Sequence, residues 1–395
     1  MKNVGVETNF KKLYWIKAIR SGMFSISIIM LFFKENGLTT SQAVVLQSWF
    51  SVAVLLFEVP TGHLADQFGR KNFIIVGSFF SAFGYILYTM SHGFYGFLLA
   101  EIVLAFGCSC VSGADSALLF DTREEMKLDG EKYILREGRA SCVGFISEGV
   151  TSFIGGSIMA LVSLRFPLYF DAVLAFSAIP VAFTLVETRT HAVEEKESSF
   201  LTMWRVLKYS LHEHKEVKWL IFFSAGISAS TLNMVWFIQM KWLSVGVPVE
   251  NFGALWAVLQ IFAALVAFKA SEIEELFGKK NSLLLIACCP IVGYFLLGTM
   301  TSMWSIGFIF LFYLTRGIND PIVKGYVNGL VDSEDRATIL SVKGLVGRLM
   351  FSVIGPLMGV VNDKFSLQMT FIASGSLFLL CSLISLVFLR RHKVI

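Results

Sequence analysis

Long apolar runs alternate with short polar stretches along the whole chain. Each run is close to the roughly 20 residues that a tilted helix needs to cross a bilayer. Backbone polar groups find no water inside a membrane, so uniform runs of this length predict helices, whereas a barrel needs short alternating strands. The pattern predicts twelve membrane-spanning helices, at residues 13–33, 42–64, 72–90, 95–120, 139–163, 167–187, 217–244, 252–270, 281–300, 303–323, 338–361 and 368–389.

The composition agrees with a membrane protein of many spans. Of the 395 residues, 55% are hydrophobic and 16% are charged, whereas a soluble domain carries about 25% charged residues. The net charge of +4 is small and gives no reason to expect a nucleic-acid partner.

Lysine and arginine gather in alternate connections between the predicted helices. Since cytoplasmic loops carry the excess of these residues, we expect both termini to be cytoplasmic, which agrees with an even number of spans. The basic connections are the amino terminus, 62–72, 121–139, 187–216, 270–280, 324–337 and the tail at 390–393.

A short basic turn at 62–72 has a weaker copy in the second half of the chain. Its sequence Phe68-Gly69-Arg70-Lys71-Asn72 aligns with Phe277-Gly278-Lys279-Lys280-Asn281. One such turn in each half indicates a duplicated architecture. We therefore expect a six-helix bundle at 1–190, a cytoplasmic linker with a surface amphipathic helix at 191–216, and a second six-helix bundle at 217–395.

The turn after the second predicted helix also carries a family signature, G-x-L-A-D-x-x-G-R-[RK]. The matching residues are Gly62, Leu64, Ala65, Asp66, Gly69, Arg70 and Lys71. With twelve spans in two halves, the sequence resembles the major facilitator superfamily. The resemblance implies an all-α membrane protein with two pseudo-symmetric bundles around a central cavity, which works by alternating access. It further implies a monomeric transporter of the bacterial inner membrane rather than an enzyme.

Two signatures of the drug–proton antiporters in that superfamily are incomplete here. Glu101 stands where the fourth helix of those proteins carries an arginine. In the fifth helix Gly155-Gly156 is present, but Thr151-Ser152 replaces the Gly-Pro pair that should precede it. The resemblance therefore extends to the superfamily and leaves the antiporter branch open.

The resemblance assigns a gating role to Gly62, Asp66, Gly69, Arg70 and Lys71. A carboxylate is favoured at the positive end of a helix dipole. In the family, the partner of this aspartate is the start of the eleventh helix, here near 337–341. Asp66 would then latch the two bundles on the cytoplasmic side. The alternative is a simple basic anchor of the turn.

Three carboxylates inside the predicted spans are candidates for proton coupling: Glu148, Glu101 and Asp115. A charge at membrane depth costs at least about 2.5–3.5 kcal/mol, so each one needs a reason. Loss of water favours the protonated form of a carboxylate, and alternating access to water would load and unload it. Structural pairing with a cation is the alternative for each.

A second group of residues could line the substrate cavity. An aromatic and polar face on the seventh helix repeats at helical spacing, and two arginines inside later spans could meet an anionic or carbonyl-bearing substrate. Packing by polar groups and pairing of the arginines with carboxylates, such as Asp320 beside Arg316, are the alternatives. The residues are Phe24, Asn233, Trp236, Gln239, Arg316 and Arg348.

These observations predict a secondary transporter that couples export of a small, partly apolar organic molecule to a proton gradient, with no cofactor or metal. The alternative is an importer or an uncoupled facilitator of a small organic solute, such as a siderophore, a sugar or an organic acid. The sequence contains none of the metalloprotease, nucleophile-elbow or phosphate-loop motifs that would favour an enzyme. Expected partners are the substrate, protons and the lipid bilayer.

Overall fold

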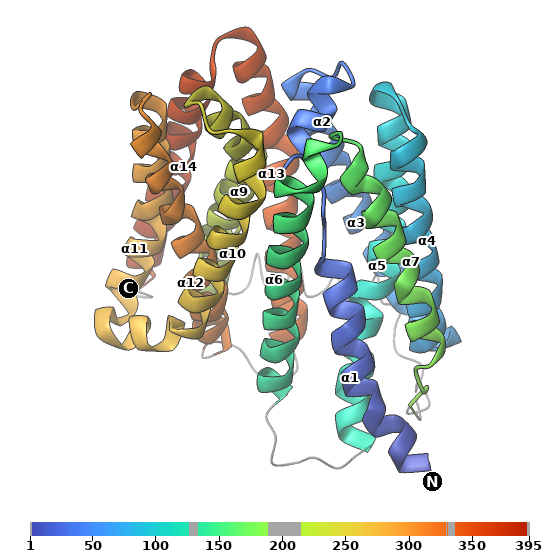
Figure 1. Cartoon of the computed structure of the whole chain (residues 1–395). Coiled ribbons are helices and arrows are strands. Elements are labelled where there is room, and N and C mark those ends of the chain that lie inside the picture. Colours follow the sequence, from blue (N-terminus) through green and yellow to red (C-terminus); the bar gives the residue numbers. More distant parts are fainter. Residues whose placement is uncertain (1, 126–132, 189–214, 329, 331–335, 393–395) are drawn as a thin grey trace. The chain divides into compact units, whose positions relative to one another are not determined.

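The structure, a computed structural model, describes residues 2–125, 133–188, 215–328, 330 and 336–392. Every regular element in these ranges is a helix (Figure 1). Eleven of the described helices are long and apolar enough to cross a membrane. The predicted linker at 191–216, with its amphipathic helix, falls almost entirely outside the described residues.

The first predicted span, 13–33, is not one continuous helix. It is divided into α1 (Lys2–Ser21) and α2 (Ile29–Glu35), with a non-helical stretch between them (Figure 1, blue). The other eleven predicted spans each contain a helix near the expected position. They are α3 (Thr40–Phe68), α4 (Arg70–Met90), α5 (Gly93–Glu125), α6 (Tyr133–Ser157) with η1 (Met159–Leu161), α7 (Phe166–Phe183), α9 (Lys215–Ser244), η3 (Val249–Asn251) with α10 (Phe252–Phe268), α11 (Ala270–Thr299), η4 (Met303–Phe308) with α12 (Ile309–Asn328), α13 (Arg336–Lys364) and α14 (Leu367–Arg391).

The chain divides into two compact units. The first contains residues 1–37, 49–199 and 249–260, and the second contains 38–48, 200–248 and 261–395. The units follow the two halves of the sequence except at two helix ends. The start of α3 belongs to the second unit, and the start of α10 belongs to the first.

The first unit is held by close helix contacts and an apolar core. Gly77 of α4 and Gly107 of α5 face each other, and a methyl group added to either would come within 2.8 Å of the carbonyl oxygen of the other. Small residues at such crossings let the two backbones approach closely. Beside this crossing, buried side chains of α1, α4 and α5 form a core that includes Phe10, Ile74 and Leu118.

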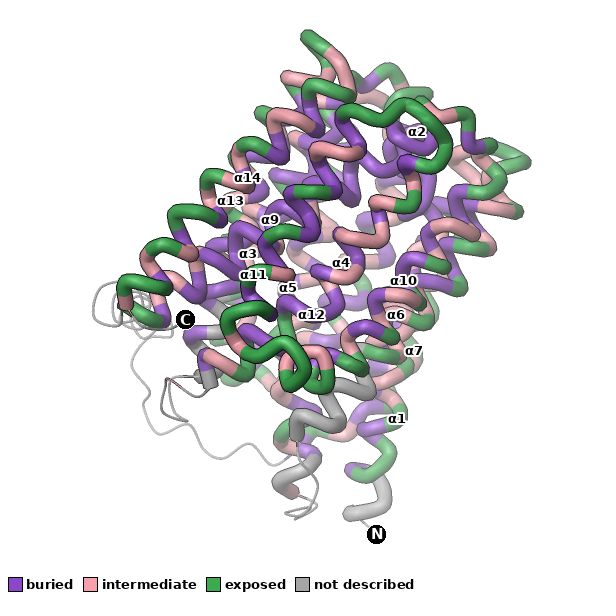
Figure 2. Tube along the Cα trace, turned by 90° about the vertical axis from the view of Figure 1, so that its left-hand side faces the viewer, coloured by how far each residue is buried: buried purple, intermediate pink, exposed green. Residues whose placement is uncertain are grey.

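The second unit is organised around α9. This helix is buried around most of its circumference, and 83% of its most apolar stretch lies inside the protein. Figure 2 shows α9 in the colour of buried residues along most of its length. Its side chains pack with those of α11, α12, α13 and α14 in one continuous apolar cluster, which includes Phe223, Ile286 and Ile339.

The starts of α3 and α10, which each belong to the unit of the other half of the sequence, are held there by specific hydrogen bonds. In the second unit, the Asp363 carboxylate of α13 accepts hydrogen bonds from the backbone N–H groups of Thr40, at 3.0 Å, and Ser41, at 2.8 Å. These donors open α3 and have no partner within their own helix. In the first unit, the Ser157 hydroxyl of α6 accepts a 3.1 Å hydrogen bond from the N–H of Ala254 in α10. Each end is therefore capped by the unit that it joins.

The predicted turn at 62–72 is much shorter than expected, because α3 continues to Phe68 and α4 begins at Arg70. Only Gly69 leaves the helical conformation, with φ +96°. Its counterpart in the sequence repeat, Gly278, has φ +69° and kinks α11 at the same place. Positive φ at both positions explains why each copy carries a glycine.

Candidate functional site

Glu148 projects from α6 toward α10. Its Oε1 atom accepts a 3.1 Å hydrogen bond from the indole N–H of Trp256, and a second from the side-chain amide of Gln260. Both donors are buried, with 1% of their surface exposed, whereas Glu148 is half-buried. A carboxylate that receives two donors from a neighbouring helix is bound more strongly when it is ionised.

Glu101 and Asp115, the other two candidate carboxylates, both lie buried in α5. Glu101 is 4% exposed and accepts a 2.5 Å hydrogen bond from the Tyr88 hydroxyl of α4. Asp115 is 8% exposed and forms a 2.9 Å ion pair with Arg20 of α1. The structure therefore joins Asp115 to a cation, which is the alternative interpretation of that residue.

The break between α1 and α2 surrounds a buried carboxylate that we did not predict. Asp171 of α7 is 1% exposed and accepts hydrogen bonds from the N–H of Phe24, at 2.6 Å, and of Ser25, at 3.2 Å. The Thr151 hydroxyl of α6 accepts a 2.8 Å hydrogen bond from the N–H of Met23. Side chains thus replace the acceptors that a continuous helix would supply.

A glycine of α6 makes room for this break. A methyl group added to Gly155 would collide with the carbonyl oxygen of Phe24. The glycine pair that resembles an antiporter signature therefore has a local packing role here. Phe24, a predicted cavity residue, is half-buried within the break, with its ring centroid 5.9 Å from that of Phe170.

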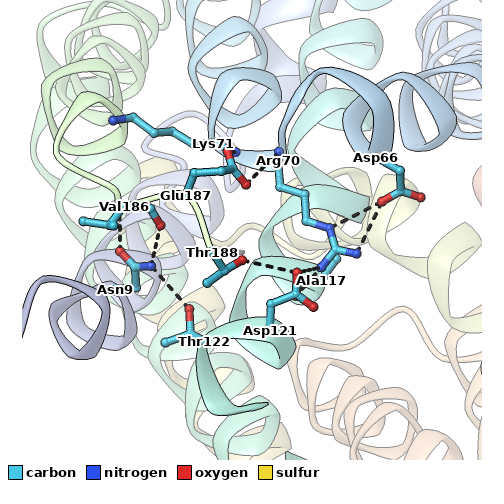
Figure 3. Close-up of polar contacts among 10 residues, drawn as sticks. All are labelled: Asn9, Asp66, Arg70, Lys71, Ala117, Asp121, Thr122, Val186, Glu187 and Thr188. Carbon is cyan, nitrogen blue, oxygen red and sulfur yellow. Dashed lines mark hydrogen bonds and ion pairs between the residues drawn. The ribbon is translucent and has the colours of Figure 1, made fainter. Parts of the chain in front are cut away.

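The predicted gate residues form a charge network at the joint of α3 and α4 (Figure 3). Arg70 is its centre. Its guanidinium lies 3.3 Å from the carboxylate of Asp66, forms an ion pair with Asp121 of α5 and donates a 2.8 Å hydrogen bond to the carbonyl of Ala117. Arg70 therefore ties the joint to the end of α5.

Glu187 caps the start of α4 in the same network. Its carboxylate accepts hydrogen bonds from the N–H of Arg70, at 3.2 Å, and of Lys71, at 2.9 Å (Figure 3). Lys71 also lies near Lys12 of α1, and partial burial together with this like charge lowers the pKa of Lys12. The expected partner of Asp66, the start of α13, belongs to the second unit, so the latch stays a prediction.

The predicted face of α9 is buried in the second unit. Asn233 has no exposed surface, and its amide donates 3.2 Å hydrogen bonds to the hydroxyls of Tyr294 in α11 and Ser374 in α14. Trp236 is 8% exposed and Gln239 is fully buried. At Asn233 the contacts match the alternative interpretation, a polar group that joins packed helices.

Arg316 of α12 and Arg348 of α13 are both half-buried. The Arg316 guanidinium lies over the ring of Tyr313, 5.5 Å from its centroid. Asp320, the expected partner of Arg316, instead contacts Lys343 and forms a 2.9 Å ion pair with Lys324. Within the described ranges, neither arginine forms an ion pair with a carboxylate.

Several residues of these sites escaped the sequence analysis. Asp171 is a carboxylate within an apolar run, and the same signal identified Glu148. The sequence analysis did not select Asp171. Arg20, Trp256 and Gln260 carry no pattern that links them to their partners, because those partners are far away in the chain. Glu187 stands just after a predicted span, where an acidic residue is unremarkable.

The apolar helices and the two helical units define a multi-pass helical membrane protein. The sequence profile of the Major Facilitator Superfamily matches residues 13–353, and the chain belongs to this family. The family consists of transporters, so the chain is a transporter and not an enzyme.

Individual relatives are distant but cover most of the chain. The tetracycline resistance protein, class H, of Pasteurella multocida is 23% identical over 82% of this chain and 81% of its own length. The uncharacterized MFS-type transporter YxaM of Bacillus subtilis (strain 168) is 23% identical over 90% of this chain and 89% of its own. The crystal structure of the nucleoside transporter NupG has a TM-score of 0.77 at 12% identity, covering 97% of this chain and 98% of that one. This likeness shows the fold alone.

Proposed function

We propose that the protein is a proton-coupled antiporter of the bacterial inner membrane. It exports a small, partly apolar organic molecule by alternating access, acts as a monomer and has both termini in the cytoplasm. The proton gradient is its energy source, and Glu148 carries the proton.

The contact of Glu148 with Trp256 and Gln260 carries this proposal. It joins α6, from the first half of the sequence, to α10, from the second half. A charged carboxylate holds its two donors more strongly than a neutral one. A proton on Glu148 therefore weakens this contact between α6 and α10. A coupling ion must change the free energy of such a contact if it is to shift the equilibrium between two conformations.

The similarity to a tetracycline resistance protein favours export of an organic molecule with apolar parts. An importer or uncoupled facilitator would use the same fold. What distinguishes the candidates is the effect of removing the proton site. A coupled antiporter then loses uphill transport and keeps exchange, whereas a facilitator has no uphill transport to lose.

The first prediction concerns Glu148→Gln, which keeps the size of the side chain and removes its charge. Proteoliposomes with an imposed pH gradient are given labelled neutral, cationic and anionic amphiphiles, tetracycline among them. We expect the wild type to accumulate at least one probe in inside-out orientation. The variant should lose this accumulation while it still exchanges labelled for unlabelled probe.

Glu250→Gln is the matched control, since Glu250 is exposed in η3 and lies outside the contact. It should keep both accumulation and exchange. Accumulation that survives Glu148→Gln would remove the assigned proton site. Equilibration of every probe without accumulation by the wild type would leave the facilitator as the function.

A further inference from the structure

Two arginines of the second unit stand out because no carboxylate of the described residues forms an ion pair with them. Arg20 pairs with Asp115, and Arg70 pairs with Asp66 and Asp121. The described contact of the Arg316 guanidinium is the Tyr313 ring, and the structure gives the Arg348 guanidinium no ion pair with any described residue. A guanidinium at membrane depth is costly when no carboxylate offsets its charge, so two such groups among the described residues indicate a function.

Arg316 and the partly exposed apolar residues of α12 lie on different sides of this helix. Phe310 and Leu314 are partly exposed on one side of this helix. Arg316 follows Leu314 by two residues. Because a helix turns about 100° per residue, the two side chains are separated by about 200° around the helix axis. Arg316 begins a polar stripe at four-residue spacing, which continues through Asp320 and Lys324, both exposed.

The same division occurs on α13. Leu349, Val353 and Leu357 are exposed and form an apolar stripe. Arg348 lies about 140° around the helix from Val353, five residues on. It shares its stripe with Gly344 and Ser352, neither of which is buried. Both arginines thus lie away from the surface that is suited to lipid, on stripes that are not fully buried, although Ser352 also donates a hydrogen bond to the carbonyl of Ser48 in α3.

The two arginines also lie at the same depth. The ion pair between Lys343 of α13 and Asp320 of α12 fixes the register of these helices. Arg316 precedes Asp320 by four residues, and Arg348 follows Lys343 by five. Because α12 and α13 run in opposite directions, both arginines are displaced from the ion pair in the same direction along the helix axes. At 1.5 Å per residue, the displacement is about 6 Å for Arg316 and about 7.5 Å for Arg348.

One turn of α9 confirms this register independently. The Ser228 hydroxyl accepts a 3.2 Å hydrogen bond from the amide of Asn319 in α12. The Cβ of the same serine would lie 3.7 Å from a methyl group added to Gly347 of α13. Asn319 and Gly347 are close neighbours of Arg316 and Arg348 in sequence, so the same turn of α9 contacts α12 and α13 beside the two arginines.

We propose that Arg316 and Arg348 together bind the carboxylate of an organic acid substrate. Guanidinium groups recognise carboxylates with paired, charge-assisted hydrogen bonds. This inference rests on the proposed function and narrows its substrate class to small organic anions with an apolar body. The ring of Tyr313 lies 5.5 Å from the Arg316 guanidinium and accepts no ionic hydrogen bond of the kind that a carboxylate would accept.

The test uses two probes of equal size, 2-naphthoate and its uncharged amide, 2-naphthamide. The thermal midpoint of the purified protein is followed in nanodiscs of phosphatidylcholine at pH 7, because a ligand of the folded state raises it. We expect 2-naphthoate to raise the midpoint in a saturable way and 2-naphthamide to have no effect. Arg316→Gln and Arg348→Gln should each weaken the apparent affinity about ten-fold or more.

Arg390→Gln, on an exposed residue in the last turn of α14, is the matched control and should keep the wild-type affinity. Equal stabilisation by the amide, unchanged affinity in both arginine variants, or no stabilisation by 2-naphthoate would each overturn the proposal. Nanodiscs that contain phosphatidylglycerol test the other source of an anion. Arginine-dependent stabilisation by that lipid instead of 2-naphthoate would assign the arginines to a headgroup.

This outcome is separable from that of the proposed function. Binding of 2-naphthoate is measured without a pH gradient and is judged by its loss in Arg316→Gln and Arg348→Gln, so the result does not depend on the proposed proton site. Failure of proton coupling would therefore leave the binding result intact. Failure of binding would leave a proton-coupled transporter whose substrate is not a carboxylate.

Discussion

At the scale of single residues, charges buried among the helices have distinct kinds of partner. Asp115 has a cation, Glu101 a hydroxyl and Glu148 an indole and an amide. The ion pair gives Asp115 a structural role, whereas the described donors to Glu148 are neutral groups. Glu148 therefore stays the proposed proton carrier.

Asp115→Asn should destabilise the protein, because it removes the carboxylate that forms the ion pair with Arg20. Breaking a buried ion pair costs about 3–5 kcal/mol, and we expect the lower end because 27% of the Arg20 side chain is exposed. The thermal midpoint in detergent, followed by tryptophan fluorescence, should fall by several degrees. Adding Arg20→Gln should recover part of the loss.

An exposed ion pair supplies the comparison for this measurement. Lys269 and Glu272 lie 2.6 Å apart, with 54% and 66% of their side chains exposed. Such pairs contribute about 0–1 kcal/mol, so Glu272→Gln should barely change the midpoint. An Asp115→Asn protein as stable as this control would show that the buried pair contributes little.

At the scale of elements, the break between α1 and α2 depends on groups from other helices. Chain N–H groups inside a membrane must find acceptors. The acceptors here are the carboxylate of Asp171 and the hydroxyl of Thr151, and Gly155 leaves the space. The first span is therefore shaped by α6 and α7 rather than by its own sequence alone.

Asp171→Ala should destabilise the first unit more than Asp171→Asn does. Alanine leaves the N–H groups of Phe24 and Ser25 without acceptors, at about 1–3 kcal/mol for each buried donor. Asparagine keeps one acceptor oxygen in the same place. Thermal midpoints of the two variants, with the yield of folded protein, measure the difference. Equal stability of both variants would mean that the carboxylate does not hold the break.

At the scale of the whole molecule, the contacts at the joint of α3 and α4 show which of the predicted gate residues is available to bind a further partner. Arg70 and Glu187 tie this joint to α5 and to the segment that follows α7 (Figure 3). Asp66 has a half-exposed side chain and a single described cation, Arg70. It is therefore the member of the network that is most available to an additional partner.

Asp66→Asn should slow transport several-fold while the apparent substrate affinity changes only a few-fold. The substitution removes the charge that would act on the start of α13 and leaves the Arg70–Asp121 pair in place. Initial rates and half-saturating concentrations in proteoliposomes separate the two effects. Glu275→Gln, at the aligned exposed position of the second copy, is the control and should have a smaller effect. Normal turnover of the Asp66→Asn protein would remove the latch.

The sequence by itself determined the order of the spans and the position of the helix in all but the first of them, because a helix that crosses a membrane needs a long apolar run of its own. It also determined the repeat: Gly69 and Gly278 share positive φ, and Asn72 and Asn281 donate equivalent hydrogen bonds to Phe68 and Phe277, at 2.9 and 3.0 Å. These features depend on neighbours in the chain, which a reader of the sequence can see.

Only the tertiary structure decided the partners of the charges and the exact course of the first span. Trp256 lies 108 residues from Glu148, and Asp171 lies 147 residues from Phe24. The sequence marks such groups as costly at membrane depth but does not say which neighbour offsets that cost. Packing chooses the neighbour: it placed Asp115 beside a cation and Asp320 beside two lysines, and among the described residues it placed no carboxylate in an ion pair with the half-buried Arg316 and Arg348.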